Sequence, residues 1–85
     1  MKTFFCQLLT KEKKLFESNI TSLVVPTQDG YLGVMANHAS MIALLGSGRV
    51  DLKDLSGEER KVNTFNILEG VLEVHKNVVT LLVEL

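Results

Sequence analysis

Cysteine is almost absent from this sequence. Cys6 is the only one, so no disulfide framework can form and no second cysteine lies at metal-ligand spacing. Such cysteine usage is typical of a reducing compartment and argues against secretion. A basic segment from Lys11 to Lys14 follows the short apolar N-terminus without a small-residue cleavage site, so we do not expect a signal peptide.

Long apolar runs and blocks of like charge are also missing. No stretch approaches the roughly 20 apolar residues of a membrane-spanning helix. Nine Lys and Arg residues balance ten Asp and Glu residues, without the basic cluster that grips a phosphate backbone. We therefore expect neither a membrane span nor a nucleic-acid partner.

The chain does contain enough apolar residues for one small domain. Its 85 residues, 46% of them apolar, include no linker, low-complexity segment or repeat, so we expect a single domain over 1–85. A chain of this length excludes a multidomain enzyme, and a single domain of this size is only modestly stable. Support from a bound partner would stabilise it further.

Turn residues divide the chain into short apolar segments, which predicts β-strands. Asp29-Gly30 predicts a tight hairpin, and the alternation over 50–53 and 72–75 predicts half-buried strands. Residues 78–83 are apolar at both parities, which predicts a strand in the middle of a sandwich, with Leu82 in the core. Pro26 predicts that its own strand is an edge there or carries a bulge.

Two segments fit a helix as well as a strand. Residues 11–17 contain good helix formers, and residues 35–45 are rich in Ala, Met and Leu, with Asn37 as a candidate N-cap. Gly46 limits the second segment in either state.

The sequence contains no clear motif for phosphate binding, nucleophilic catalysis or metal binding. Gly46-Ser47-Gly48 is too short for a phosphate-binding loop and lacks the spacing of a nucleophile elbow. Cys6, His38 and His75 are not at metal-ligand spacing. We therefore expect no catalytic residue, metal or cofactor, with Cys6 buried and His75 solvated.

His38 and Lys76 each leave alternatives open. His38, together with Asn37, either hydrogen-bonds the backbone of its own loop or is held out to contact a partner. Lys76 lies in a tight turn, as the modified lysine of a carrier domain does, although His75 and Asn77 are not the usual neighbours of such a lysine.

An ordered set of motifs resembles one family. The set comprises Leu15-Phe16, Asp29-Gly30-Tyr31-Leu32-Gly33-Val34, Asn37-His38-Ala39, Ala43-Leu44-Leu45 with Gly48, Phe65-Asn66-Ile67, the segment from Gly70 to Val74, and the segment from Asn77 to Leu82. No single motif is specific. Their order and spacing are similar to those of the N-terminal domain of the epsilon subunit of the F-type ATP synthase.

The resemblance implies an all-β fold, a small β-sandwich of about ten short strands. It also implies a non-catalytic rotor subunit in the central stalk of a proton-translocating complex, with the gamma subunit and the c-ring as partners and no homo-oligomer. Such a subunit is peripheral to the bacterial inner membrane, on its cytoplasmic face, and associates with it only through the complex. The partner-facing residues, gathered at one end of the domain, would be Asp29, Gly30, Tyr31, Gly33, Met35, Asn37, His38, Ala39 and Met41.

The chain departs from the family pattern in three ways, one of them being Leu68-Glu69-Gly70 where the family often has Ser-Gly-Gly before the late hairpin. Ala36 and Ser40 stand where prolines are common around the His-Ala pair, so we expect a more mobile loop in the free domain. The sequence stops at Leu85, so we expect no C-terminal helical domain and do not carry over that domain's inhibition of ATP hydrolysis. The alternatives to a rotor subunit are a lysine-modified carrier domain and a β-sandwich adaptor of another complex.

Overall fold

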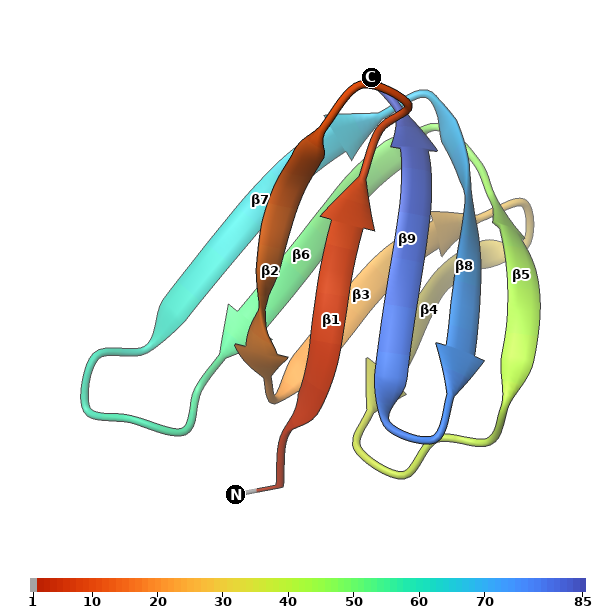
Figure 1. Ribbon diagram of the computed structural model, residues 1–85. Coiled ribbons are helices and arrows are strands. Elements are labelled where there is room, and N and C mark those ends of the chain that lie inside the picture. Colours follow the sequence, from red (N-terminus) through yellow and green to blue (C-terminus); the bar gives the residue numbers. More distant parts are fainter. Residues whose placement is uncertain (1) are drawn as a thin grey trace.

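The computed structural model describes residues 2–85, which form nine β-strands and no helix (Figure 1). The strands are β1 (Phe4–Leu9), β2 (Lys14–Ile20), β3 (Ser22–Thr27), β4 (Gly30–Met35), β5 (Met41–Leu45), β6 (Gly48–Asp54), β7 (Lys61–Ile67), β8 (Glu69–His75) and β9 (Val78–Glu84). The predicted all-β fold is confirmed, with slightly fewer strands than expected. Residues 2–85 contain no helix that is long and apolar enough to cross a lipid bilayer.

The strands lie in two layers that pack face to face (Figure 1). The first layer has the order β2-β1-β9-β8-β5. In the second layer β3 lies between β4 and β6, and β7 lies outside β6. The layers are joined where Thr27 of β3 pairs with Leu45 of β5. One continuous sheet therefore folds over itself, which gives the predicted sandwich.

Strand β9 occupies the centre of the first layer, parallel to β1 and antiparallel to β8. Its side chains alternate: Val79, Leu81 and Val83 are buried, whereas Val78 and Leu82 are exposed. The central position of this strand was predicted correctly, but the placement of Leu82 in the core is wrong. Its side chain points to the outer face of the layer, away from the core.

Every strand contributes to the single core. The buried apolar side chains are Phe4, Cys6, Leu8, Ile20, Leu23, Val25, Val34, Leu45, Val50, Leu52, Ile67, Leu72, Val74, Val79, Leu81 and Val83. Cys6 is fully buried among them, as predicted, and this burial raises the pKa of its thiol to about 12. The thiol is therefore protonated and unreactive at neutral pH.

Both segments that fitted a helix are resolved as strands with adjoining turns. A turn through 10–13 leads into β2, and a loop over 36–40 leads into β5. Strand β5 pairs with β8, from Met41 opposite Val74 to Leu45 opposite Gly70. The helix alternative is wrong because this cross-strand pairing outweighs the helix propensity of the Ala and Leu residues.

Two hairpins use different tight turns. Gln28 and Asp29 connect β3 with β4, and Gly30 follows them at a φ of 117°, so the predicted hairpin is confirmed. Lys76 and Asn77 connect β8 with β9 at φ angles of 48° and 61°. Two central residues with positive φ define a type I′ turn, whose twist matches that of the flanking strands.

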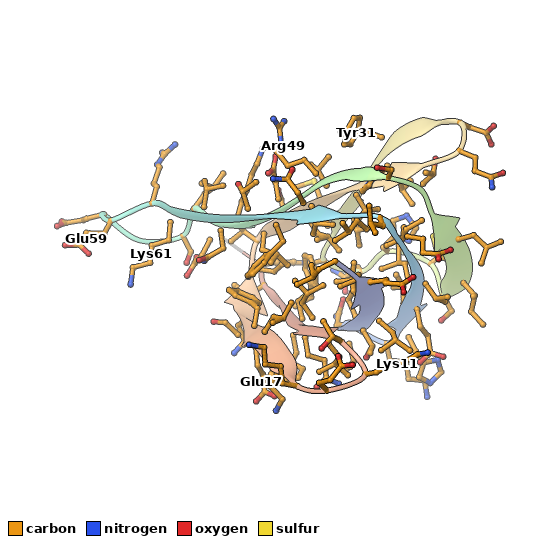
Figure 2. The ribbon with its side chains drawn as sticks, turned by 90° about the horizontal axis from the view of Figure 1, so that it is seen from above. Lys11, Glu17, Tyr31, Arg49, Glu59 and Lys61 are labelled. Atoms are coloured by element: carbon orange, nitrogen blue, oxygen red, sulfur yellow. The ribbon has the colours of Figure 1, made fainter. Side chains whose placement is uncertain are left out.

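Pro26 and Gly48 pack closely where β3 separates from β6. The pairing between these strands ends at Val24, so Pro26 lies at a local edge, as its missing N–H predicted. A Cβ atom on Gly48 would lie 2.8 Å from the Cβ of Pro26, which leaves room only for glycine. Farther along, β6 and β7 extend as a hairpin arm beyond the sandwich, with Glu59 near its tip (Figure 2).

Candidate partner-binding surfaces

Several predicted partner-facing residues lie along β4, at one edge of the second layer. This strand pairs only with β3. Tyr31, Gly33 and Met35 are exposed and alternate with the inward-facing Leu32 and Val34. Tyr31 exposes 61% of its surface and Met35 exposes 65%. The three residues form an exposed stripe, which we call the β4 stripe.

The two predicted contact loops lie at opposite ends of β4. Asp29 and Gly30 precede the stripe, whereas the loop with Asn37, His38 and Ala39 follows it. A strand of six residues separates its ends by about 17–20 Å. The expectation that these residues gather at one end of the domain is therefore wrong, because an extended strand connects the two loops.

Tyr31 has a structural contact in addition to its exposed ring. Its hydroxyl oxygen accepts a hydrogen bond from the backbone N–H of Arg49 at 3.4 Å. Figure 2 places both residues on the outer side of the second layer, away from Lys11 and Glu17. Tyr31 thereby connects the β3–β4 hairpin to β6, so its substitution would disturb the fold as well as the surface.

The loop over 36–40 is held by hydrogen bonds to its own backbone and to the β8–β9 turn. Nδ1 of His38 lies 2.8 Å from the Ala39 carbonyl oxygen, and the His38 N–H donates to the Met35 carbonyl. The backbone N–H of Asn37 donates to Oδ1 of Asn77 at 2.6 Å. His38 is half-buried, whereas Asn37 and Ala39 are exposed. His38 thus hydrogen-bonds the backbone of its own loop, which was the first of its two alternatives. This bond uses only Nδ1, so the rest of the ring is available to a partner.

Met41 is a predicted site residue that also packs against the core. It begins β5, is half-buried and packs against the core cluster. Its side chain stabilises the fold, so any partner would reach only its exposed part.

The first layer carries an exposed apolar row that the predicted site does not include. Leu44 of β5 lies opposite Val71 of β8, Val71 lies opposite Leu82 of β9, and Leu82 lies beside Leu9 of β1. Leu44 exposes 66% of its surface and Leu82 exposes 47%, while Leu9 is half-buried. We call these four residues the apolar row. Strands β5 and β9 carry apolar residues at both parities, which is the sequence signal that could have identified part of the row; Val71 shares its parity with Glu69 and Glu73 on β8 and gave no such signal.

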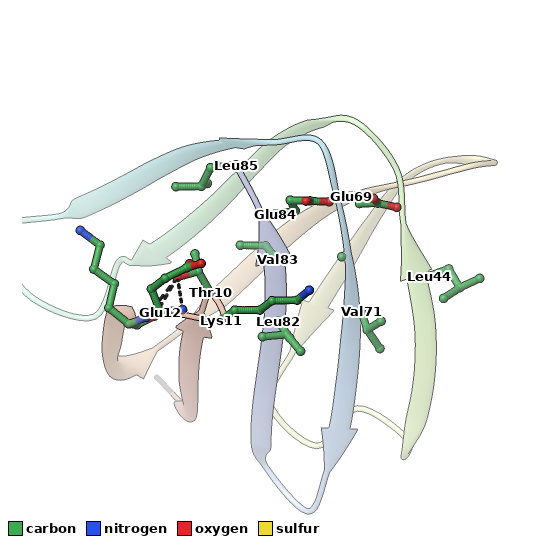
Figure 3. Close-up of a pocket in the computed structure, with 12 residues that line it drawn as sticks. Thr10, Lys11, Glu12, Leu44, Glu69, Val71, Leu82, Val83, Glu84 and Leu85 are labelled. Atoms are coloured by element: carbon green, nitrogen blue, oxygen red, sulfur yellow. Dashed lines mark hydrogen bonds between the residues drawn. The ribbon is translucent and has the colours of Figure 1, made fainter.

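Charged residues border the apolar row at a groove of about 650 Å³ (Figure 3). Lys11 reaches over the groove from the β1–β2 turn. The hydroxyl oxygen of Thr10 stabilises this turn by accepting hydrogen bonds from the backbone N–H groups of Glu12 and Lys13. Glu69 and Glu84 are directly opposite on β8 and β9, and Figure 3 shows their carboxyl groups pointing toward one another. A hydrogen bond with Glu84 and repulsion by its charge raise the pKa of Glu69.

The other candidate residues for chemistry stay apart. Cys6 is in the core, His75 is exposed as predicted, and Lys76 is exposed in its turn. Within residues 2–85, no group of three or more His, Cys, Asp or Glu side chains could hold a metal ion. The arrangement thus defines a class of protein: a small β-sandwich that offers contact surfaces, one of them apolar.

The family within this class follows from comparison with known proteins. The model of the ATP synthase delta/epsilon chain β-sandwich domain matches residues 3–85, and the chain belongs to this family. The resemblance inferred from the motifs is thereby confirmed.

Individual relatives support the same assignment. An ATP synthase epsilon chain of Xanthomonas euvesicatoria pv. vesicatoria is 36% identical over 84 residues, which cover 99% of this chain and 58% of that protein. The ATP synthase epsilon chain of Leptospira borgpetersenii serovar Hardjo-bovis is 34% identical over 77 residues, which cover 91% of this chain and 58% of that protein. The chain therefore spans little more than half the length of these relatives.

Solved structures show the same fold at low sequence identity. A chain in the cryo-EM structure of the Euglena gracilis mitochondrial ATP synthase (OSCP, F1 and c-ring) superposes with a TM-score of 0.85 at 19% identity, covering 95% of this chain and 50% of that one. A chain in the central stalk and c-ring structure of the Tetrahymena thermophila mitochondrial ATP synthase gives a TM-score of 0.79 at 17% identity, covering 98% and 64%.

Proposed function

We propose that this chain acts as a rotor subunit in the central stalk of a proton-translocating F-type ATP synthase and binds the gamma subunit and the c-ring. Its role is mechanical: it couples rotation of the ring to gamma and takes no part in the chemistry. The complex holds it as a peripheral subunit at the cytoplasmic face of the bacterial inner membrane. The observation that carries the proposal is the exposed apolar row on a domain of the delta/epsilon family.

The two kinds of surface have different roles in this proposal. The apolar row is buried against gamma, because apolar side chains that meet a partner leave water favourably. The β4 stripe, which lies on the outer side of the second layer, and the loop over 36–40 provide separate contacts. Since the β3–β4 hairpin and this loop lie at opposite ends of β4, they meet different partners or different parts of one partner.

The test is capture of gamma and the c-ring from detergent-solubilised membranes on the tagged chain. We expect both to be retained. The double variant Leu44→Gln with Leu82→Gln should reduce retention strongly, because burial of the exposed part of each side chain is worth about 1 kcal/mol. Val62→Gln is the matched control, since Val62 is an exposed apolar residue on β7, in the other layer.

Two outcomes would contradict the proposal. The first is a wild-type chain that captures neither gamma nor the ring. The second is equal capture by the Leu44/Leu82 double variant and by the Val62 control, which would exclude the apolar row as the interface.

A lysine-modified carrier domain is the second candidate, because Lys76 is exposed at the tip of a tight turn between two strands. Intact-mass spectrometry of the protein from its native source separates the two candidates. A mass equal to that of the unmodified chain removes the carrier function, whereas an added group on Lys76 would support it.

A further inference from the structure

Two asparagines that are 40 residues apart in sequence form a reciprocal amide pair. Asn77 accepts the backbone N–H of Asn37 on its Oδ1 at 2.6 Å, and its Nδ2 donates to Oδ1 of Asn37 at 3.1 Å. The Asn77 amide therefore uses its acceptor and its donor on the same partner residue. This Asn37–Asn77 amide pair ties the loop over 36–40 to the turn between β8 and β9.

Both members of the amide pair occupy left-handed backbone conformations. Asn37 has a φ of 65° and Asn77 a φ of 61°. Asparagine tolerates this region better than most residues with a side chain, although glycine reaches it more easily. Asparagine at both positions supplies the left-handed turn and also a side-chain amide, which glycine lacks.

The loop that the amide pair fixes also fixes the tautomer of His38. The Ala39 carbonyl oxygen can only accept, so Nδ1 of His38, 2.8 Å away, carries the hydrogen. In the neutral ring, Nε2 is then the acceptor. No described residue hydrogen-bonds Nε2, and no buried side-chain nitrogen or oxygen in the described chain lacks a partner. Nε2 is therefore accessible to solvent.

We infer that Asn37 and Asn77 are positioning residues: their amide pair holds the loop over 36–40 so that His38 presents Nε2 as a hydrogen-bond acceptor to a partner. The matching group on the partner is a donor, such as a backbone N–H, a hydroxyl or a Lys or Arg side chain. This inference rests on the proposed function, in which the loop contacts gamma or the ring. It also replaces the expectation of a mobile loop, because hydrogen bonds restrict the segment that has no proline.

The expected effect on binding follows from the fraction of molecules with the loop in place. The apparent dissociation constant rises in inverse proportion to the binding-competent fraction. Loss of one or two exposed hydrogen bonds lowers that fraction by about 3- to 10-fold. The apparent affinity should fall by the same factor, while the core remains intact.

Asn77→Gly is the informative variant, with Lys76→Gly as its matched control. Glycine accepts the left-handed conformation at both positions of the turn, so both variants keep the hairpin. Only Asn77→Gly removes the amide pair. In the isolated chain we expect Asn77→Gly to lose the hydrogen-exchange protection of the Asn37 N–H, and Lys76→Gly to retain it.

Nitrogen-15 NMR of the imidazole and binding to the reconstituted gamma–c-ring complex complete the test. The wild-type ring should be in the Nδ1–H tautomer at about pH 8, with a mixed population in Asn77→Gly. Asn77→Gly should bind about 3- to 10-fold more weakly, and Lys76→Gly like the wild type. His38→Ala should weaken binding at least as much.

The outcomes separate this inference from the proposed function. Normal binding of His38→Ala would exclude His38 as a partner contact and overturn the inference, whereas failure of the wild type to bind would overturn the proposed function. If His38→Ala weakens binding and Asn77→Gly does not, the amide pair has no positioning role. An unprotected Asn37 N–H in the wild type would overturn the inference without any partner.

Discussion

Neighbouring leucines on β9 provide a matched pair for testing the face assignment of the sandwich. Leu81 has no exposed surface, whereas Leu82 exposes 47% of its own. Truncation of each to Ala removes the same atoms from adjacent positions of one strand. We predict that Leu81→Ala is strongly destabilising and that Leu82→Ala is nearly neutral for the isolated domain.

The surroundings of the two residues determine the magnitudes. Leu81 lies between Leu72 of β8 and Leu8 of β1, both fully buried, so the cavity left by truncation cannot be filled from solvent or by exposed neighbours. Such truncations cost about 2–5 kcal/mol. Leu82 is already half in water and leaves no enclosed cavity, so its truncation should cost about 1 kcal/mol or less.

The assay is urea unfolding followed by far-UV circular dichroism, with thermal melts as a second measurement. A domain of this size has a total stability of about 4–13 kcal/mol, so Leu81→Ala should shift the urea midpoint strongly without changing the m-value. Its Tm should fall by about 10 °C or more, against a few degrees for Leu82→Ala. Equal losses in the two variants would refute the assignment of the core face, because they would place Leu82 inside a packed layer.

Three further predictions follow from local contacts. Gly70→Ala should cost about 1–3 kcal/mol in urea unfolding, because its Cβ would lie 2.7 Å from a carbonyl oxygen of β9, whereas Gly33→Ala meets nothing within 4 Å and should be tolerated; equal effects would contradict this packing. The pKa of Glu69 is raised in the folded state by its hydrogen bond with Glu84 and by that residue's charge. Protonation of Glu69 therefore stabilises the folded state at low pH, and this stabilisation is lost as the pH rises through the raised pKa. Glu69→Gln should therefore increase the Tm relative to wild type more at about pH 7 than at about pH 4, and a difference that does not change with pH would contradict the coupling. Cys6 should resist a thiol-specific reagent in the native domain at about pH 8 and react in urea, because burial raises its pKa to about 12; rapid native labelling would contradict its placement in the core.

Local sequence signals predicted the strands and one hairpin well. Asp29-Gly30 marked the β3–β4 turn, and the alternation around Val50 and Leu72 marked which side chains enter the core. These features depend on neighbours in sequence, where turn chemistry and a period of two are sufficient.

Features that depend on distant residues could not be predicted in the same way. Asp51 has the parity of a solvated residue, yet it is buried between the guanidinium of Arg49 and the hydroxyl of Thr64, which approaches from β7. The pairing of Asn37 with Asn77 depends on how two turns meet in space. The wrong placement of Leu82 has the same origin, since an apolar strand does not reveal whether a second layer covers its outer face.

The structure exposes the predicted site residues along β4, but it does not gather the two contact loops at one end of the domain. Tyr31, Gly33 and Met35 are all exposed, as a contact surface requires. The expectation that the contact loops lie together came from the family resemblance and not from the residues themselves. A strand between them separates them by its full length, which sequence spacing alone does not express.

The parallel pairing of β1 with β9 has a consequence for how the domain is made. Phe5 pairs with Val78 and Leu9 with Leu82, so β1, the earliest of the nine strands in sequence, needs β9, the last of them, as its neighbour. Strand β9 also lies between β1 and β8, and until it is synthesised β1 and β2 have only each other as hydrogen-bonded neighbours in the sheet. Folding during translation must therefore wait for nearly the whole domain, and the early strands expose apolar edges in the meantime. Chaperones that cover the nascent β1–β2 hairpin should matter more for this domain than for one whose sheet grows in chain order.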